Sequence, residues 1–169
     1  MSLSRRTLLR TAAALSGAVA IAGGATVVHW WDQAATPGWR SLSDDERRFL
    51  DALADTIFPP GGEPPLGGAE SGATKVFDEI VGAMPETQAN TLKIFLHSLN
   101  ASTRPTHFAA FDALSPEERS EALLDWENHP VSAWRTAVQS LKILLGVGYT
   151  SHPEVASILS PYFLLGYGR

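Results

Sequence analysis

Apolar residues recur three and four positions apart along most of this 169-residue chain. This spacing is the period of an α-helix with one buried face, and no segment shows the sustained alternation of a half-buried strand. The apolar runs are separated by proline, glycine and polar residues, as in a chain that turns between helices. The pattern predicts an all-α fold, a small single-domain bundle of about six helices over residues 43–169 without a solenoid repeat. One short patch expected to be helical holds Phe108, Phe111 and Leu114.

Two capping boxes indicate where helices begin. In Ser43-Asp44-Asp45-Glu46 the serine hydroxyl can accept from the amide three residues on, while the glutamate reaches back. Ser115-Pro116-Glu117-Glu118 repeats the pattern, with proline in the first turn. Pro59-Pro60-Gly61-Gly62 ends the first helix, and the proline- and glycine-rich residues 63–72 are expected to form a loop.

The N-terminus resembles an export signal. Residues 4–10, S-R-R-T-L-L-R, precede the uncharged stretch 11–28, which is rich in small residues and contains an A-I-A cleavage sequence. The pair Arg5 and Arg6 resembles the twin-arginine signal, S-R-R-x-F-L-K. We therefore expect export by the twin-arginine route, and a location in the periplasm or on the periplasmic face of the inner membrane.

The same pattern divides the chain into three parts. We expect residues 1–31 to be the signal peptide, residues 32–42 a linker and residues 43–169 the helical domain. The alternative is that residues 11–28 stay in the protein as a membrane anchor, because 18 uncharged residues are close to the shortest helix that spans a bilayer.

Composition excludes several classes of function. The chain has no cysteine, which rules out disulfides, attached c-type haem, cysteine-bound iron–sulfur clusters and a thiol nucleophile. Beyond residue 31 there are 10 basic and 18 acidic residues, so nucleic acid is not an expected partner.

The residues that carry chemistry do not form a recognisable catalytic motif. The five histidines, at positions 29, 97, 107, 129 and 152, lack the H-E-x-x-H and E-x-x-H spacings of helical metal sites. Asp125 and His129 could share one helix face, but a hydrogen-bonded pair at a helix end is the favoured interpretation. There is no G-x-S-x-G motif, and the glycine pairs follow no strand. The sequence therefore predicts no catalytic, cofactor-binding or metal-binding residue in this chain.

Short blocks follow one another along the chain in a definite order. They are L-S-x-x-E at 42–46, A-L-A-D-T-I-F-P at 52–59, G-A at 68–69, V-F-D at 76–78, F-D-A-L-S-P-E-E-R at 111–119, G-Y-T-S-H-P-E-V at 148–155 and L-G-Y-G at 165–168. Together these blocks resemble the gluconate 2-dehydrogenase subunit 3 family, and they extend over the whole predicted domain.

The resemblance implies a non-catalytic accessory subunit rather than an enzyme. Such a subunit assists the folding, maturation and twin-arginine co-export of a large FAD-dependent sugar or alcohol dehydrogenase of the glucose-methanol-choline class. The implied partners are that large subunit, the twin-arginine translocase and a c-type cytochrome subunit, so FAD and haem c would belong to other chains. The alternatives are a membrane-anchored structural assembly subunit of a periplasmic respiratory complex and an independent exported metal-binding helical protein.

The expected partner interface lies around the end of the first helix, the following loop, the turn at 149–153 and the aromatic tail. Its predicted residues are Thr56, Phe58, Pro59, Pro60, Tyr149, Pro153, Tyr162 and Tyr167. The alternative is that these residues close the helical core, and for Thr56 and Tyr149 both interpretations stay open.

Overall fold

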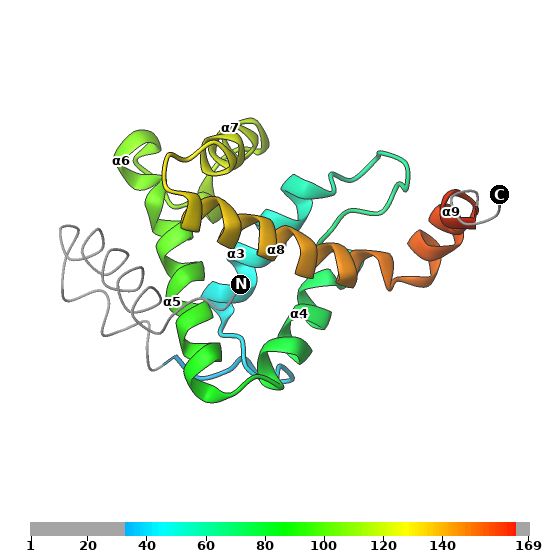
Figure 1. The fold of residues 1–169 in the computed structure, drawn as a ribbon, viewed down its shortest axis with the longest axis horizontal. Coiled ribbons are helices and arrows are strands. Elements are labelled where there is room, and N and C mark those ends of the chain that lie inside the picture. The colour runs from blue at the N-terminus through cyan, green and yellow to red at the C-terminus, as the bar shows by residue number, and fades with distance from the viewer. Residues whose placement is uncertain (1–32, 165–169) are drawn as a thin grey trace.

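The computed structural model describes residues 33–164, with side chains as far as residue 160 (Figure 1). Within these residues there is no strand, which confirms the predicted all-α class. The helices of ten residues or more are α3 (Asp44–Ile57), α4 (Ala73–Gly82), α5 (Glu86–Ser102), α7 (Pro116–Glu127), α8 (Ser132–Thr150) and α9 (Pro153–Leu164). A single turn, α6 (Arg104–His107), and a 3-10 turn, η1 (Phe111–Ala113), connect α5 to α7.

Some predictions fall outside the described part of the chain. Arg5, Arg6 and Tyr167 lie outside it, as does the side chain of Tyr162. Across residues 33–164, no helix combines the length and the apolar character that crossing a bilayer requires.

Both predicted capping boxes are present. At the start of α3 the N–H of Ser43 donates to Glu46 at 2.8 Å, and the N–H of Glu46 donates to the Ser43 hydroxyl oxygen at 3.4 Å. Ser115 and Glu118 make the same reciprocal pair at the start of α7. These bonds satisfy amides that a first helical turn leaves without partners, so both helices begin where the sequence predicts.

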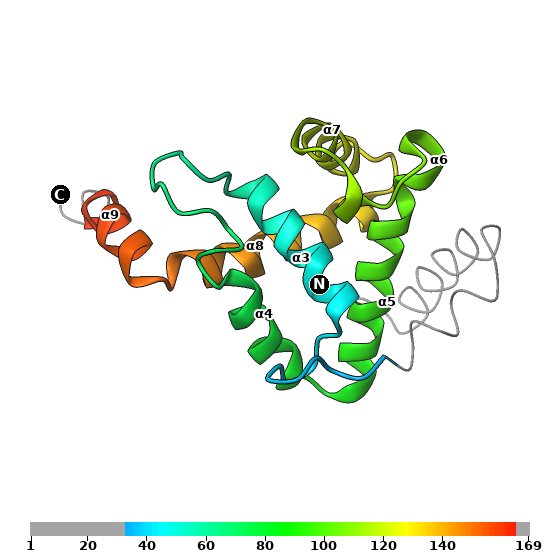
Figure 2. The same ribbon diagram turned by 180° about the vertical axis from the view of Figure 1, so that it is seen from behind.

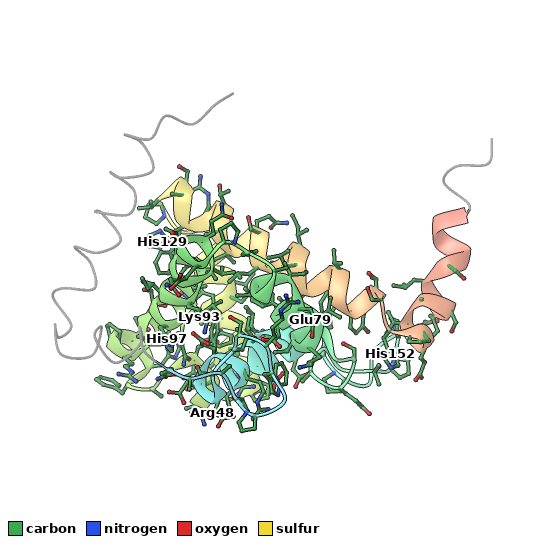
Figure 3. All side chains as sticks on the ribbon, turned by 90° about the horizontal axis from the view of Figure 1, so that it is seen from below. Arg48, Glu79, Lys93, His97, His129 and His152 are labelled. Carbon is green, nitrogen blue, oxygen red and sulfur yellow. The ribbon has the colours of Figure 1, made fainter. Side chains whose placement is uncertain are left out.

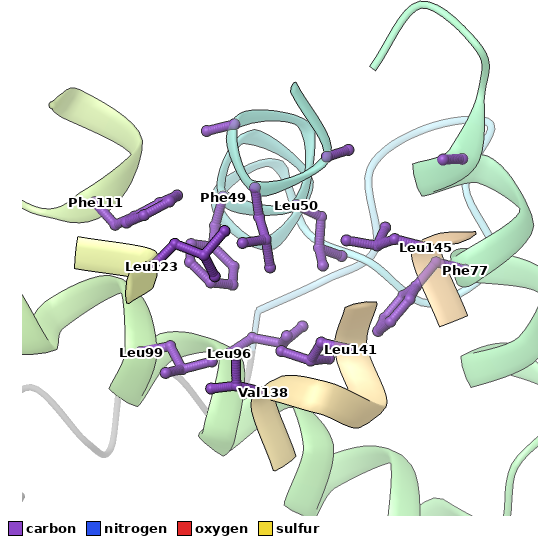
Figure 4. Packing of buried hydrophobic residues seen from close by; sticks show 14 of the residues in the cluster. Phe49, Leu50, Phe77, Leu96, Leu99, Phe111, Leu123, Val138, Leu141 and Leu145 are labelled. Carbon is purple, nitrogen blue, oxygen red and sulfur yellow. The ribbon is translucent and has the colours of Figure 1, made fainter. Parts of the chain in front are cut away.

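The core lies around α3, against which α4, α5, α7 and η1 pack. Figures 1 and 2 show α8 on one side of α3, crossing in front of it in the first view and behind it in the second. Figure 4 shows the apolar side chains that α3, α4, α5, α7, α8 and η1 contribute to this core. The ring of Phe111 packs edge-on against Phe49, with centroids 5.6 Å apart, and lies 4.7 Å from Trp126. Burial of these rings fixes η1 and α7 onto α3.

The predicted helical patch at residues 108–114 is wrong at Phe108. Helix α6 ends at His107, and Phe108 follows it with a left-handed backbone (φ 57°) and a side chain that is 93% exposed. The hydroxyl of Thr103 donates to the carbonyl oxygen of Ala109 at 2.7 Å and holds the chain reversal. Phe111 is buried after the reversal, so the helical spacing in the sequence joins two segments that do not share a helix.

Residues 33–42, which lie in the segment expected to be a linker, contain no helix, and the end of this segment is fixed to the domain. Asp78 on α4 is fully buried and accepts from the N–H groups of Arg40, Ser41 and Leu42 at 2.7, 2.8 and 2.9 Å. Leu42 is itself buried in the core. The entry to α3 is therefore set by a side chain on α4.

Candidate partner interface

The loop between α3 and α4, residues 58–72, is tied to the end of α3, and we call it the signature loop. The N–H of Gly68 donates to the carbonyl oxygen of Phe58 at 2.9 Å. The carboxylate of Asp55 accepts from the N–H of Ala69 at 2.8 Å. These bonds close the loop on the last turn of α3, within the A-L-A-D-T-I-F-P block.

Tyr149, from a block far away in the sequence, holds the same loop from α8. Its ring stacks on Phe58, with centroids 4.1 Å apart and planes 4° from parallel. Its hydroxyl donates to the carbonyl oxygen of Leu66 at 3.0 Å. Tyr149 is buried, and burial raises the pKa of its hydroxyl, so it stays protonated and remains a donor at neutral pH.

Two glycines allow the backbones at this site to approach closely. A Cβ on Gly68 would lie 2.2 Å from the carbonyl oxygen of Ala54, and a Cβ on Gly148 would lie 2.7 Å from that of Ala73. Gly68 thus seats the loop on α3, and Gly148 seats α8 on the start of α4. The blocks at 52–59, 68–69 and 148–155 therefore meet in space at one end of the bundle.

The predicted interface residues divide into two groups. Thr56 is half-buried and donates to the carbonyl oxygen of Ala52 at 2.7 Å, while Phe58 and Tyr149 face each other as described. Pro59 and Pro60 in the loop and Pro153 at the start of α9 are exposed. In Figure 1 the loop and α9 project from the same end of the bundle. Contact between a partner and any of these residues stays a prediction.

Sequence reasoning did not single out the residues that hold the site together. Asp55, Leu66, Gly68 and Gly148 make the bonds or close approaches described above. Asp55, Gly68 and Gly148 lie in blocks of the family resemblance, and that position was the only sequence signal that could have pointed to them. The order of residues in a block does not say which polar atom bonds across the fold.

A buried ionic cluster lies at the start of α3, away from this loop. The carboxylate of Glu46 lies 3.3 Å from the ammonium of Lys93 and 3.3 Å from Nε2 of His97, both on α5. Burial alone would raise the pKa of Glu46, but the contact with His97, the Ser43 amide and the charge of Lys93 hold it below its ordinary value. The cluster joins α3 to α5 as a charged pair with a histidine beside it.

The histidines are spread through the molecule, as Figure 3 shows for His97, His129 and His152. The ring of His129 stacks on Trp134, with centroids 5.2 Å apart, and its Nδ1 accepts from the N–H of Val131. In the part of the chain that the structure describes, no three histidine or acidic side chains are grouped to hold a metal ion.

Replacing Tyr149 by phenylalanine is expected to lower the free energy of unfolding by about 1 kcal/mol. The stack on Phe58 stays, but the carbonyl oxygen of Leu66 loses its donor. Urea unfolding measures the loss. In Thr150→Val, the control at the next residue, an exposed hydroxyl that bonds only within α8 is removed, and a change below about 0.5 kcal/mol is expected. Equal losses in the two variants would contradict a role for Tyr149 in holding the loop.

Comparison with known families identifies the domain. The family model described as gluconate 2-dehydrogenase subunit 3 matches residues 44–168, from the first residue of α3 past the end of α9. The matched range includes the signature loop and Tyr149. The chain has no match among curated proteins or among solved structures. The chain belongs to the gluconate 2-dehydrogenase subunit 3 family.

Proposed function

We propose that this chain is a non-catalytic accessory subunit that helps an FAD-dependent dehydrogenase subunit to mature and carries it into the periplasm by the twin-arginine route. The family description names one subunit of a dehydrogenase, so other subunits are its natural partners. The pair Arg5 and Arg6 would supply the address for the complex. FAD would be held by the large subunit, and haem c by a cytochrome subunit. The twin-arginine route moves folded proteins. Export of the folded large subunit together with this chain would explain why so small a chain carries such a signal.

The proposal rests on the hydrogen bonds that side chains in the family blocks at 52–59 and 148–155 make within the domain. Asp55 bonds to Ala69, and Tyr149 bonds to Leu66, so both side chains set the shape of the loop. A catalytic group, by contrast, needs its reactive atom within reach of a substrate. Blocks that maintain one loop shape are what a subunit needs if it acts by presenting a surface to another protein.

The proposal predicts that changing both Arg5 and Arg6 to lysine keeps the dehydrogenase in the cytoplasm. Lysine preserves the charge but lacks the planar guanidinium group that distinguishes arginine in recognition. The measurement is dehydrogenase activity and bound flavin in the periplasmic and cytoplasmic fractions of cells that express both subunits. We expect the activity to move from the first fraction to the second.

Arg10→Lys provides the matched control, because the twin-arginine pattern has lysine at this position. This variant is expected to export the dehydrogenase as the unchanged chain does. If the Arg5/Arg6 variant still delivers full activity to the periplasm, the escort role is wrong. N-terminal sequencing of the exported chain separates a cleaved signal from a retained anchor.

A further inference from the structure

Just before α3 the chain folds back on itself and lies against three helices, and we call residues 36–42 the latch. The latch begins with a turn in which the N–H of Trp39 donates to the carbonyl oxygen of Thr36 at 2.9 Å, with Gly38 (φ 83°) in the left-handed region. The N–H of Thr36 donates to the carbonyl oxygen of Leu42 at 2.9 Å, so the two ends of the latch meet. In Figures 1 and 2 this blue segment passes the lower ends of α4 and α5.

Side chains of α4 and α5 hold the backbone of the latch. Asp78 accepts the three N–H groups described above, and the ammonium of Lys75 donates to the carbonyl oxygen of Gly38 at 2.7 Å. Lys93 on α5 donates to the carbonyl oxygen of Ser41. These side chains come together only when the two helices have packed. The latch is therefore closed by the tertiary fold and not by its own sequence.

The side chain of Trp39 ties the latch to α3 as well. Its ring centroid lies 4.4 Å from the ammonium of Lys75 and 5.9 Å from the guanidinium carbon of Arg47 on α3. A cation over an aromatic face is attracted by the quadrupole of the ring. Trp39 is half-buried and packs against the core, so its ring joins the latch to α3 and α4 together.

The contacts of the latch shield the peptide bond between Arg40 and Ser41. The side chain of Arg40 is 53% exposed and forms a surface ion pair with Glu79. The backbone is not free in the same way, because the N–H groups of Arg40 and Ser41 both donate to the buried carboxylate of Asp78. A protease binds its substrate as an extended chain with free backbone groups. Hydrolysis of this bond therefore requires the latch to open first.

We infer that residues 36–42 are a folding-dependent latch between the export signal and the body of the chain. While α3, α4 and α5 are packed, the latch fixes the point at which the signal segment joins the domain and closes the Arg40–Ser41 bond to proteases. Before these helices pack, the side chains that hold the latch are not assembled and the bond is open. A chain that has not folded is then open to loss of its signal, as suits a route that moves folded proteins. The meaning for export rests on the proposed function, whereas the latch itself does not.

The test is limited digestion of the purified full chain with trypsin, which cuts after lysine and arginine, followed by mass spectrometry. No lysine or arginine stands between residues 11 and 39. A cut after Arg40 therefore gives a product that begins at Ser41, and any earlier cut leaves the latch on the body. Arg119 on α7 is the reference site, because α7 packs on α3 and α8 and a cut there needs the bundle to open. We expect the unchanged chain to be cut after Arg40 no faster than after Arg119.

Trp39→Ser is the variant that opens the latch. It removes the ring from Lys75 and Arg47 and changes no fully buried residue, so the domain is expected to stay folded. We expect cutting after Arg40 to become about tenfold faster, because cleavage follows the population of the open form, and cutting after Arg119 to keep its rate. Circular dichroism checks the fold.

Trp134→Ser is the matched control, the same change at another half-buried tryptophan. The ring of Trp134 packs against Phe95 and His129. This variant removes a comparable contact from the domain, and it is expected to leave the ratio of the Arg40 and Arg119 cutting rates unchanged.

Glu79→Ala is a second control, made at the latch. It frees the side chain of Arg40 from its ion pair but keeps the backbone bonds to Asp78. The site after Arg40 is therefore expected to stay protected. Rapid cutting there in this variant would show that the ion pair, and not the latch, protects the bond, and would overturn the inference.

Two further outcomes would also overturn it. If the unchanged chain is cut after Arg40 before α7 is cut, the latch is open in the folded domain. If Trp39→Ser changes both cutting rates equally, or neither, the latch does not open separately from the core. The digestion needs no dehydrogenase, so these outcomes leave the accessory role standing. Failure of the Arg5/Arg6 export test would, in turn, leave the latch standing.

Discussion

Asp78→Ala is expected to lower the free energy of unfolding by about 4 kcal/mol, because one buried carboxylate serves three backbone donors. Without it the N–H groups of Arg40, Ser41 and Leu42 lose their acceptor, and Leu42 is buried where water cannot replace it. Urea unfolding followed by circular dichroism at neutral pH measures the loss. The change also releases the segment that leads into α3.

Glu79→Ala, at the next residue, is the control for this prediction. Glu79 is exposed, and its carboxylate meets Arg40 at 3.4 Å in a surface ion pair, which contributes less than about 0.5 kcal/mol. Asp78→Asn is expected to fall between the two, since its amide keeps one acceptor but turns a donor toward donors. Similar stabilities for Asp78→Ala and Glu79→Ala would show that Asp78 does not anchor the segment.

The contribution of Asp78 is also expected to depend on pH. Burial raises its pKa, but the bonds from Arg40, Leu42 and Ser41, together with Lys75, outweigh burial and hold the pKa below its ordinary value. A carboxyl group whose pKa is lower in the folded state adds stability above its unfolded pKa, about 3.9. This stability is lost as the pH falls through the folded pKa. The difference in the free energy of unfolding between the unchanged chain and Asp78→Asn is therefore expected at pH 7 and should shrink as the pH falls below the unfolded pKa, about 3.9.

The helix boundaries could be predicted because the signals for them are local. The serine and glutamate of a capping box are three residues apart, so Ser43 and Ser115 mark the starts of α3 and α7 whatever the rest of the chain does. The role of Asp78 could not be predicted in this way. Its partners lie 36 to 38 residues earlier, and no periodic pattern links an acidic residue to amides at that distance. Phe108 was misplaced for a related reason, since spacing alone cannot reveal a chain reversal.

The candidate site was predictable as a region but not in its details. The sequence analysis placed Thr56 and Tyr149 in one expected interface, and the blocks that contain them do meet at the signature loop. Whether an aromatic ring faces inward or outward depends on what the fold places opposite it. Tyr149 finds Phe58 and a backbone acceptor, so burial of the ring and satisfaction of its hydroxyl occur together.

Gly68→Ala is the second change with a large expected effect, a loss of about 3 kcal/mol in the free energy of unfolding. The added Cβ would lie 2.2 Å from the carbonyl oxygen of Ala54, which is part of a helix backbone and cannot move aside. The loop must shift instead, and the bond from Gly68 to Phe58 is lost. Gly62→Ala in the same loop is the control, because its Cβ would find no atom closer than 3.7 Å.

The shift caused by Gly68→Ala also predicts how it combines with Tyr149→Phe. Both changes act on one loop, since Tyr149 bonds to Leu66, two residues before Gly68. Once the loop has moved, that bond is already broken, so removing the hydroxyl costs little more. The double variant is expected to be at least about 0.5 kcal/mol more stable than the sum of the single losses predicts. Additive losses would mean that the loop has two independent attachments. The blocks at 68–69 and 148–155 would then stabilise separate parts of the fold rather than one surface.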